Sequence, residues 1–315
     1  MKKIDTPLTV EGKGHKNKKS RRGKSFGYQV LGFGSGGGGP ICIAYDFFIV
    51  SGGGGGVSAY GGGGGGGGVH FSYGAPGTAG VTKNDACGNI SIQIGAGGSG
   101  NSGPGGGYSP YAAGDGGTSI AFKCEPTAVT VKGGGGADTR HNNGRAAPTP
   151  GGGSGGGGGC FHLAGTSGGA GSCYGNPGSG AATYSCSPSR FRSGSGGGAC
   201  TAATAGGSGG NGAAGCGKAS DIEGSTKNFG CGGVGSGVSN CLNGRGDGGN
   251  PSNPTASQGG GGGRAGAGAD GVVYLRFPTS CKPANMGVSP GCNSIITTGA
   301  CTVLKFVVSG CVTFT

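Results

Sequence analysis

Short apolar segments separated by glycine are the main pattern along this chain. Residues 41–50 (ICIAYDFFIV) are apolar except for Asp46, and glycine follows them, as expected for a strand buried on both faces. Residues 89–94 and 128–132 alternate with period two, which is typical of strands with one buried face. No helical period of useful length occurs, so the pattern predicts an all-β body. Three further segments are strand candidates: 69–73, 118–123 and 271–277.

Glycine contributes 91 of the 315 residues, and much of it stands in unbroken runs. A glycine run has no side chain to bury and loses more backbone entropy on folding than any other sequence. It therefore forms neither a helix nor an ordinary core. Either it stays disordered, or its bare backbones pack together and bond to each other. The longest runs are 52–56, 61–68, 133–136, 155–159 and 259–263.

Residues 133–270 form a low-complexity centre rich in Gly, Ser, Ala and Asn. One interpretation is a flexible linker. Cysteine and aromatic residues interrupt the glycine, however, and linkers avoid both. This favours a bundle of extended threefold helices, the glycine analogue of polyproline II, in which each buried N–H and C=O bonds to a neighbouring helix. The expected fold is all-β with glycine-rich coil: short strands plus stacked polyglycine II helices, stapled by disulfides, without significant α-helix.

The disulfide staples are predicted from 14 cysteines scattered evenly along the chain. None has C-x-x-C spacing, so zinc-ribbon and thioredoxin-like sites are not indicated. Disulfides would compensate for a small core by about 2–4 kcal/mol each, and they need an oxidising environment. The alternative is that some are small buried residues. The pairing is left open among Cys42, Cys87, Cys124, Cys160, Cys173, Cys186, Cys200, Cys216, Cys231, Cys241, Cys281, Cys292, Cys301 and Cys311.

The positive charge is concentrated near the N-terminus. The formal net charge is +12, and more than half of the excess lies in the first two dozen residues. This predicts a basic attachment arm over residues 1–35 that docks on an acidic partner, another subunit or nucleic acid; a disordered tail is the alternative. Its candidate attachment residues, with two aromatic anchors, are Lys13, Lys16, Lys18, Lys19, Arg21, Arg22, Lys24, Phe26 and Tyr28.

The C-terminal residues have a different composition. Residues 302–308 and 311–315 read as two strands joined by Ser309-Gly310 in a hairpin-like turn. We therefore expect three parts: the arm over 1–35, a glycine-rich body over 36–278, and a small cysteine-rich β-hairpin module over 279–315.

Signals for catalysis are weak. Strings of the G-x-G-x-x-G type carry no information in this background, because none follows a strand and opens a helix. Cys160 and His162 are close in sequence, but the surrounding glycine offers nothing to hold an imidazole or shape a pocket. The 11 acidic residues are scattered, so paired carboxylates are unsupported. We expect no enzyme, no small-molecule substrate, no cofactor and no metal.

Aromatic residues near the glycine runs have two interpretations. They could form a rim that binds a sugar or a protein, or they could pack across the bare glycine faces. The candidates are Tyr60, His70, Tyr73, Tyr108 and Tyr111.

Targeting signals are also weak. The charged N-terminus lacks a following apolar region, so no signal peptide is expected, and no segment has the length of a transmembrane helix. We expect synthesis in a cytoplasm and no membrane insertion.

Five segments in a fixed order carry a family resemblance. They are FFIVSGGGGG (47–56), ISIQIGAGG (90–98), GDGGTSIAF (114–122), VTVKGGGG (129–136) and GADGVVYLRF (268–277). Over about residues 41–278, this order resembles the glycine-rich domains of bacteriophage virion proteins, especially tail-fibre and fibre-tip adhesin proteins. The cysteines and the basic arm depart from that pattern.

The resemblance implies a non-enzymatic virion structural protein, a homo-oligomer that is extracellular after assembly. Stacked polyglycine II helices would stiffen it, and exposed loops would bind the host surface. Its partners would be other virion proteins or copies of itself, with a host-surface protein or glycan as a further candidate. The alternatives are a capsid decoration protein anchored by the basic arm, a self-assembling extracellular filament subunit and, last, an ice-binding protein, for which the regular repeat is missing.

Overall fold

The chain divides into two units, Met1–Ile41 and Cys42–Thr315, and the second is described here by itself. A computed structural model describes residues 42–58, 61–75, 78–84, 88–102, 112–138, 143–149, 151–159, 166–181, 193–205, 213–235 and 258–314. The predicted attachment arm lies outside these residues. Outside them, too, are Tyr60, Tyr108, Tyr111, Cys87, Cys160, Cys186 and Cys241.

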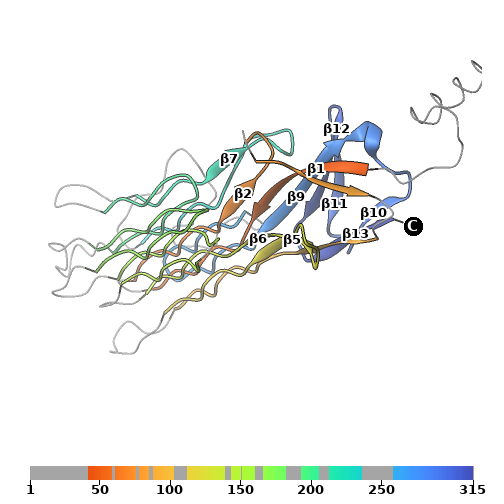
Figure 1. Cartoon of the computed structure of the whole chain (residues 1–315). Coiled ribbons are helices and arrows are strands. Elements are labelled where there is room, and N and C mark those ends of the chain that lie inside the picture. Colours follow the sequence, from red (N-terminus) through yellow and green to blue (C-terminus); the bar gives the residue numbers. More distant parts are fainter. Residues whose placement is uncertain are drawn as a thin grey trace, which may run out of the picture. The chain divides into compact units, whose positions relative to one another are not determined.

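Two antiparallel sheets and a small hairpin make up the regular structure of the described residues, apart from one 3₁₀ turn (Figure 1). All six strands predicted between residues 41 and 277 form, and the described residues contain no α-helix, which confirms the all-β class. The first sheet has the order β11-β12-β9-β1-β2, with β3 also paired to β1. Its strands are β1 (Cys42–Val50), β2 (Val69–Phe71), β3 (Val81–Asn84), β9 (Val272–Pro278), β11 (Ser294–Thr298) and β12 (Cys301–Phe306).

The second sheet has the order β10-β13-β4-β5-β6, and β7 pairs only with β8. A short 3₁₀ turn, Thr279–Cys281, follows β9. The remaining strands are β4 (Ile90–Gln93), β5 (Ser119–Lys123), β6 (Val129–Val131), β7 (Lys218–Ser220), β8 (Lys227–Phe229), β10 (Met286–Ser289) and β13 (Gly310–Phe314).

The main core lies where the two sheets contribute to one cluster of buried side chains. Phe47 and Leu275 from the first sheet join Ile92 and Val312 from the second. On the other face of the first sheet, Phe48 belongs to a second cluster, which includes Ile222 and Phe229 from the β7–β8 hairpin. This explains a difference from the expected strand: β1 is buried on both faces only over its last four residues, and in its first part alternate residues are exposed.

The C-terminal residues join both sheets of the body. The two strands expected there form as β12 and β13, but they do not pair with each other as a hairpin. Instead, β12 pairs with β9 in the first sheet, and β13 pairs with β4 in the second. Their apolar faces explain this placement, because Leu304 and Val312 are both buried in the core shared by the two sheets.

The disulfide prediction is corrected for most of the described cysteines. The register of the strands sets other residues opposite them: Asn84 faces Cys42, Pro278 and Thr298 flank Cys301, and Ser91 and Ser289 flank Cys311. Cys231 is buried, and its sulfur accepts a hydrogen bond from the N–H of Gly217 at 3.0 Å. For Cys216 the disulfide stays a prediction. The free thiols are Cys42, Cys124, Cys173, Cys200, Cys281, Cys292, Cys301 and Cys311.

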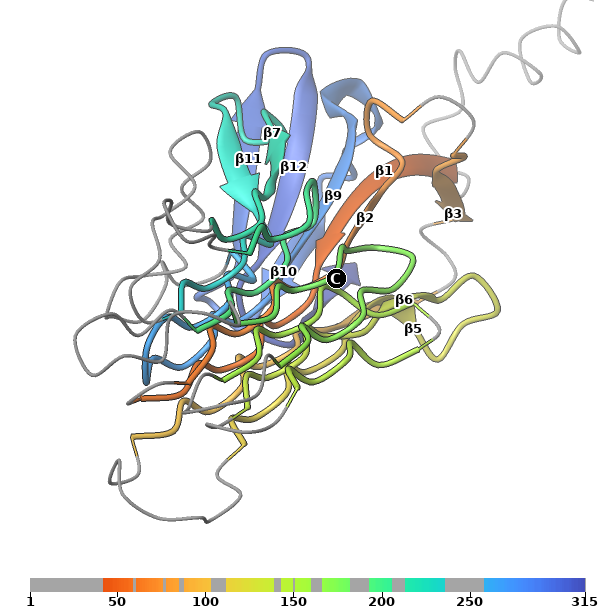
Figure 2. The ribbon, with the colours of Figure 1, turned by 90° about the vertical axis from the view of Figure 1, so that its left-hand side faces the viewer.

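Glycine-rich segments continue directly from the strands (Figure 2). Residues 51–57 follow β1, and the N–H groups of successive residues in this segment donate to three different segments in turn. The partner returns to the same segment at every third residue, which is the period that side-by-side polyglycine II helices require. The acceptors of the bonds from Gly52, Gly53, Gly54, Gly55, Gly56 and Val57 are Gly117, Ala269, Gly65, Gly114, Gly266 and Gly62, at 2.8–3.1 Å.

The run Gly61–Gly68, which we call the central run, is buried throughout and has six bonded neighbours. It donates backbone bonds to residues of 135–138, 194–197 and 259–262, and it accepts them from residues of 51–57, 154–157 and 233. A Cβ atom built at Gly64 would overlap the carbonyl group of Gly54, and those at Gly62 to Gly67 would overlap other carbonyls in the same way. The central run therefore requires glycine because backbones approach on all sides. We call the whole set of bonded segments the glycine lattice.

Outer segments of the glycine lattice carry side chains on the side that faces solvent. Ala96 and Ser99 are exposed at a spacing of three, and so are Ser167, Ala170 and Cys173. Gly98 and Gly169, between them in sequence, are buried and bonded to neighbouring segments. Each outer segment thus turns its bare backbone inward and its Cβ atoms outward.

Candidate functional site

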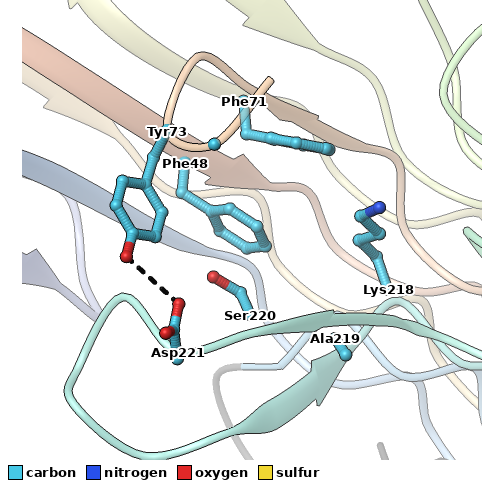
Figure 3. A pocket seen from close by; sticks show the side chains of 8 residues that line it. Phe48, Phe71, Tyr73, Lys218, Ala219, Ser220 and Asp221 are labelled. Carbon is cyan, nitrogen blue, oxygen red and sulfur yellow. Dashed lines mark hydrogen bonds between the residues drawn. The ribbon is translucent and has the colours of Figure 1, made fainter. Parts of the chain in front are cut away.

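A pocket of about 300 Å³ lies between the outer face of the first sheet and the β7–β8 hairpin (Figure 3). One wall comes from β1, β2 and the turn that follows β2. The other wall comes from β7 and the residue after it. The pocket is lined by Phe48, Phe71, Tyr73, Gly74, Lys218, Ala219, Ser220 and Asp221.

The first wall is aromatic. Phe48 is buried, with 1% of its surface exposed, and its ring lies 5.6 Å from that of Phe71 and 5.0 Å from that of Phe229. Phe71 and Tyr73 are only partly buried. The wall therefore rests on a fixed ring and offers two partly accessible rings to a ligand.

The second wall is polar. Lys218 and Ser220 are two residues apart on β7, so their side chains share one face of the strand. The ammonium nitrogen of Lys218 lies 5.0 Å from the centre of the Phe71 ring, within the range of a cation–π contact. Figure 3 shows Lys218 at one end of the pocket and Asp221 near Tyr73 at the other.

Tyr73 connects the two walls. Its hydroxyl donates to Oδ1 of Asp221 at 3.2 Å, and the Arg276 guanidinium lies over its ring at 4.3 Å. Burial raises the pKa of the Tyr73 hydroxyl, the hydrogen bond to Asp221 raises it further, and the charge of Arg276 opposes both effects. The hydroxyl is therefore a neutral donor at physiological pH.

Glu223 holds the hairpin onto the sheet. Only 8% of its side chain is exposed; Tyr274 and Lys305 each donate to its Oε1 at 2.6 Å, and Lys227 contacts Oε2. Burial alone would raise the pKa of this carboxyl, but the three donors outweigh it and lower the pKa to about 2. Burial raises the pKa of Tyr274, and the hydrogen bond to Glu223 and the charge of that carboxylate raise it further. The wall formed by β7 is thus fixed by a charged, hydrogen-bonded group.

The two described aromatic candidates lie in different surroundings. Tyr73 lines the pocket, and its binding role stays a prediction. His70 lies between Phe47, at 5.2 Å, and Tyr174, on which it stacks at 4.5 Å with an interplanar angle of 25°. Burial lowers the pKa of His70. This favours the packing interpretation for His70.

The β7–β8 hairpin is not among the strands predicted from the sequence. Its sequence signal is weak because both strands are only three residues long and each carries one lysine. The clearest local mark is Gly224, which has a φ of +86°, a conformation that favours glycine in a turn. A glycine turn at Gly224 between the segments KAS and KNF is therefore the sequence feature that could have indicated this hairpin.

No group of three or more His, Cys, Asp or Glu side chains that could hold a metal ion occurs in the described part of the chain. Within the same residues, no helix has the length and apolar character needed to cross a membrane. Comparison of the chain with protein-family models, curated proteins and solved structures finds no match.

Proposed function

We propose that this chain is a non-enzymatic structural protein of a bacteriophage particle, a fibre or fibre-tip element that meets the host surface. The observation that carries the proposal is the glycine lattice, in which the central run is bonded to six neighbouring segments. The resemblance of residues 41–278 to glycine-rich virion domains agrees with it.

The glycine lattice supports a mechanical role. Each net backbone hydrogen bond contributes about 0.5–1.5 kcal/mol, and the bonds here join segments that are far apart in sequence. Displacing one segment breaks bonds to several neighbours at once. Stiffness of this kind needs little apolar side chain, which suits a thin element exposed to solvent.

The ends of the segments support a display role. Ser58 donates its N–H to Asn101 at 2.8 Å, and Gly62 donates to Asp138, so the ends distant from the strands contact each other. Thr166 and Gly159 are likewise joined by a side-chain bond at 2.6 Å. These described ends are thereby held together at the part of the glycine lattice distant from the strands, an arrangement that favours contact with a surface.

The pocket gives no support for catalysis. One oxygen of the Asp221 carboxylate already accepts a hydrogen bond from the Tyr73 hydroxyl, and the Ser220 hydroxyl accepts one from the N–H of Ile222 at 3.3 Å. Among the described residues, no side chain forms the hydrogen bond to Ser220 that a general base would form.

Labelling of intact particles tests the proposal. Gold-labelled antibody against the full-length chain should mark the distal ends of tail fibres on virions of the encoding phage. Label spread evenly over the capsid would support a decoration protein instead. Unlabelled virions, together with concentration-dependent fibres of the purified chain in electron micrographs, would support a filament subunit and contradict the proposal.

A further inference from the structure

Lys218 stands at the pocket without an acidic partner. Lys83, Lys227, Lys305 and Arg145 each form an ion pair with a carboxylate. Lys218 forms none with the described carboxylates, and its ammonium group lies over the face of the Phe71 ring. An ammonium group held over a ring and beside a pocket is positioned to bind an anion.

The opposite end of the pocket offers hydrogen-bond acceptors. Oδ1 of Asp221 accepts a hydrogen bond from the Tyr73 hydroxyl. The second oxygen of the Asp221 carboxylate can accept a hydrogen bond from a ligand. The Ser220 hydroxyl accepts the Ile222 N–H and keeps its own proton to donate. The pocket therefore combines one cation, one open carboxylate oxygen and one hydroxyl donor around partly exposed rings.

We propose that this pocket binds an acidic sugar, a pyranose ring that carries a carboxylate. The ring's C–H face lies beside Tyr73, its carboxylate pairs with Lys218, whose ammonium group lies over Phe71, and its hydroxyls bond to Asp221 and Ser220. C–H groups carry a partial positive charge that suits the negative face of an aromatic ring. The volume of about 300 Å³ is at the lower limit for ligand pockets, in agreement with one sugar unit.

An aromatic carboxylic acid fits less well. Its carboxylate would pair with Lys218 and its ring would pack on the aromatic side chains. Its apolar edge, however, would displace water from the Asp221 carboxylate without offering a hydrogen-bond donor in return. A sugar has hydroxyl donors around its whole edge. A neutral sugar, in turn, would leave the Lys218 ammonium without its counter-charge.

The inference deepens the proposed host-contact role, and it rests on that role only in taking the sugar to be one displayed on the host surface. Binding of a free sugar tests the pocket, whereas particle labelling tests the place in the virion. Sugar binding by a chain that is absent from virions would preserve the pocket and reject the role. Label on fibre ends without sugar binding would support the place in the virion and reject the sugar-binding pocket.

Calorimetric titration of the full chain with methyl β-glucuronide and methyl β-glucoside tests the site. The acidic sugar should bind with a Kd on the order of 1 mM, at least about fivefold tighter than its neutral counterpart. Because Lys218 is accessible to solvent, raising the salt from about 0.02 M to about 0.5 M should reduce this preference. The salt series needs no variant and so is independent of folding.

Lys218→Met removes the charge and keeps a chain of similar length. It should lower the affinity for the glucuronide to that for the glucoside, and the exposed-lysine control Lys282→Met should leave both affinities unchanged. The proposal is overturned by an absence of binding at about 20 mM sugar, by equal binding of the two sugars, or by an unchanged preference in Lys218→Met.

Discussion

The β-sheets and the glycine lattice bury the same backbone groups in opposite ways. In the sheets, side chains such as Leu275 and Phe306, both fully buried, fill the space beside the hydrogen-bonded strands. In the lattice, the space is filled by other backbones, and a residue such as Gly64 has a carbonyl group where a Cβ would be. The sheets therefore depend on side-chain volume, whereas the lattice depends on its absence.

The two regions meet at serine residues. Ser51 follows β1, is fully buried, donates its hydroxyl to the carbonyl of Lys132 at 2.7 Å and accepts the N–H of Gly68 at 2.7 Å. Ser119 begins β5, donates to the carbonyl of Val50 at 2.8 Å and accepts the N–H of Gly95 at 3.0 Å. Their hydroxyls satisfy backbone groups at the change from ladder bonding to threefold bonding.

The largest effect is expected from Gly64→Ala. The added methyl group would overlap the Gly54 backbone, which bonded neighbours hold in place, so unfolding free energy should fall by more than about 4 kcal/mol. Gly291→Ala is the control, because a Cβ at Gly291 meets no atom within 4 Å, and it should change stability by less than about 0.5 kcal/mol. Denaturant unfolding measures both. Equal effects of the two variants would refute the close packing of the lattice.

Leu275→Ala should give the next largest effect, a loss of about 3 kcal/mol, because it leaves a cavity between the sheets. Leu275→Met keeps the volume and should cost less than about 1.5 kcal/mol. The same unfolding assay applies. A loss from Leu275→Met as large as that from Leu275→Ala would show that the sheets are as intolerant of shape as the lattice.

Ser51→Ala tests the junction. It leaves the Gly68 N–H and the Lys132 carbonyl without their hydroxyl partner, which should cost about 2 kcal/mol. Amide hydrogen exchange should then accelerate first at Gly68, next to the removed group. Unchanged stability and exchange would mean that the junction does not need the hydroxyl.

Glu223→Gln should have the smallest effect, about 1–2 kcal/mol at neutral pH, since it weakens only the attachment of the hairpin. The pKa of Glu223 falls from 4.5 in the unfolded chain to about 2 in the folded one, so its contribution is complete above pH 4.5 and disappears as the pH falls to 2. Urea unfolding from pH 7 to pH 2 should show wild type and variant converging at the acid end. A constant difference between them would contradict this role.

Much of the fold could be predicted because glycine and strand patterns are local. The six predicted strands follow from apolar runs such as 41–50, and the need for backbone-to-backbone bonding follows from the glycine runs. The partners of each run could not be predicted, because identical glycines carry no information about which segment lies beside which. The lattice takes part of that order from the sheets: β1 pairs with β9, and Gly53 after β1 bonds to Ala269 before β9.

The pocket was largely beyond prediction from the sequence. Tyr73 was a candidate as an aromatic near glycine, but Lys218 and Asp221 reach it across 145 residues or more of chain. The bulge in β5 was also beyond prediction from the sequence. Phe122 has a φ of +55°, and the register of β5 shifts against β4. As a result, the neighbouring residues Ala121 and Phe122 are both buried in the core, although strict alternation would expose one of them. The pocket and the bulge both depend on contacts between segments that are distant in sequence.

The outward Cβ atoms of the peripheral segments set a limit on growth. A second molecule that offered its own bare backbone to Ala96, Ser99, Ser167 or Ala170 would meet methyl or hydroxymethyl groups before any amide came within reach. In a glycine-rich polymer without such groups, each outer backbone can form hydrogen bonds with a further chain. Small side chains at every third position of these described segments therefore oppose the addition of a further backbone layer on that side.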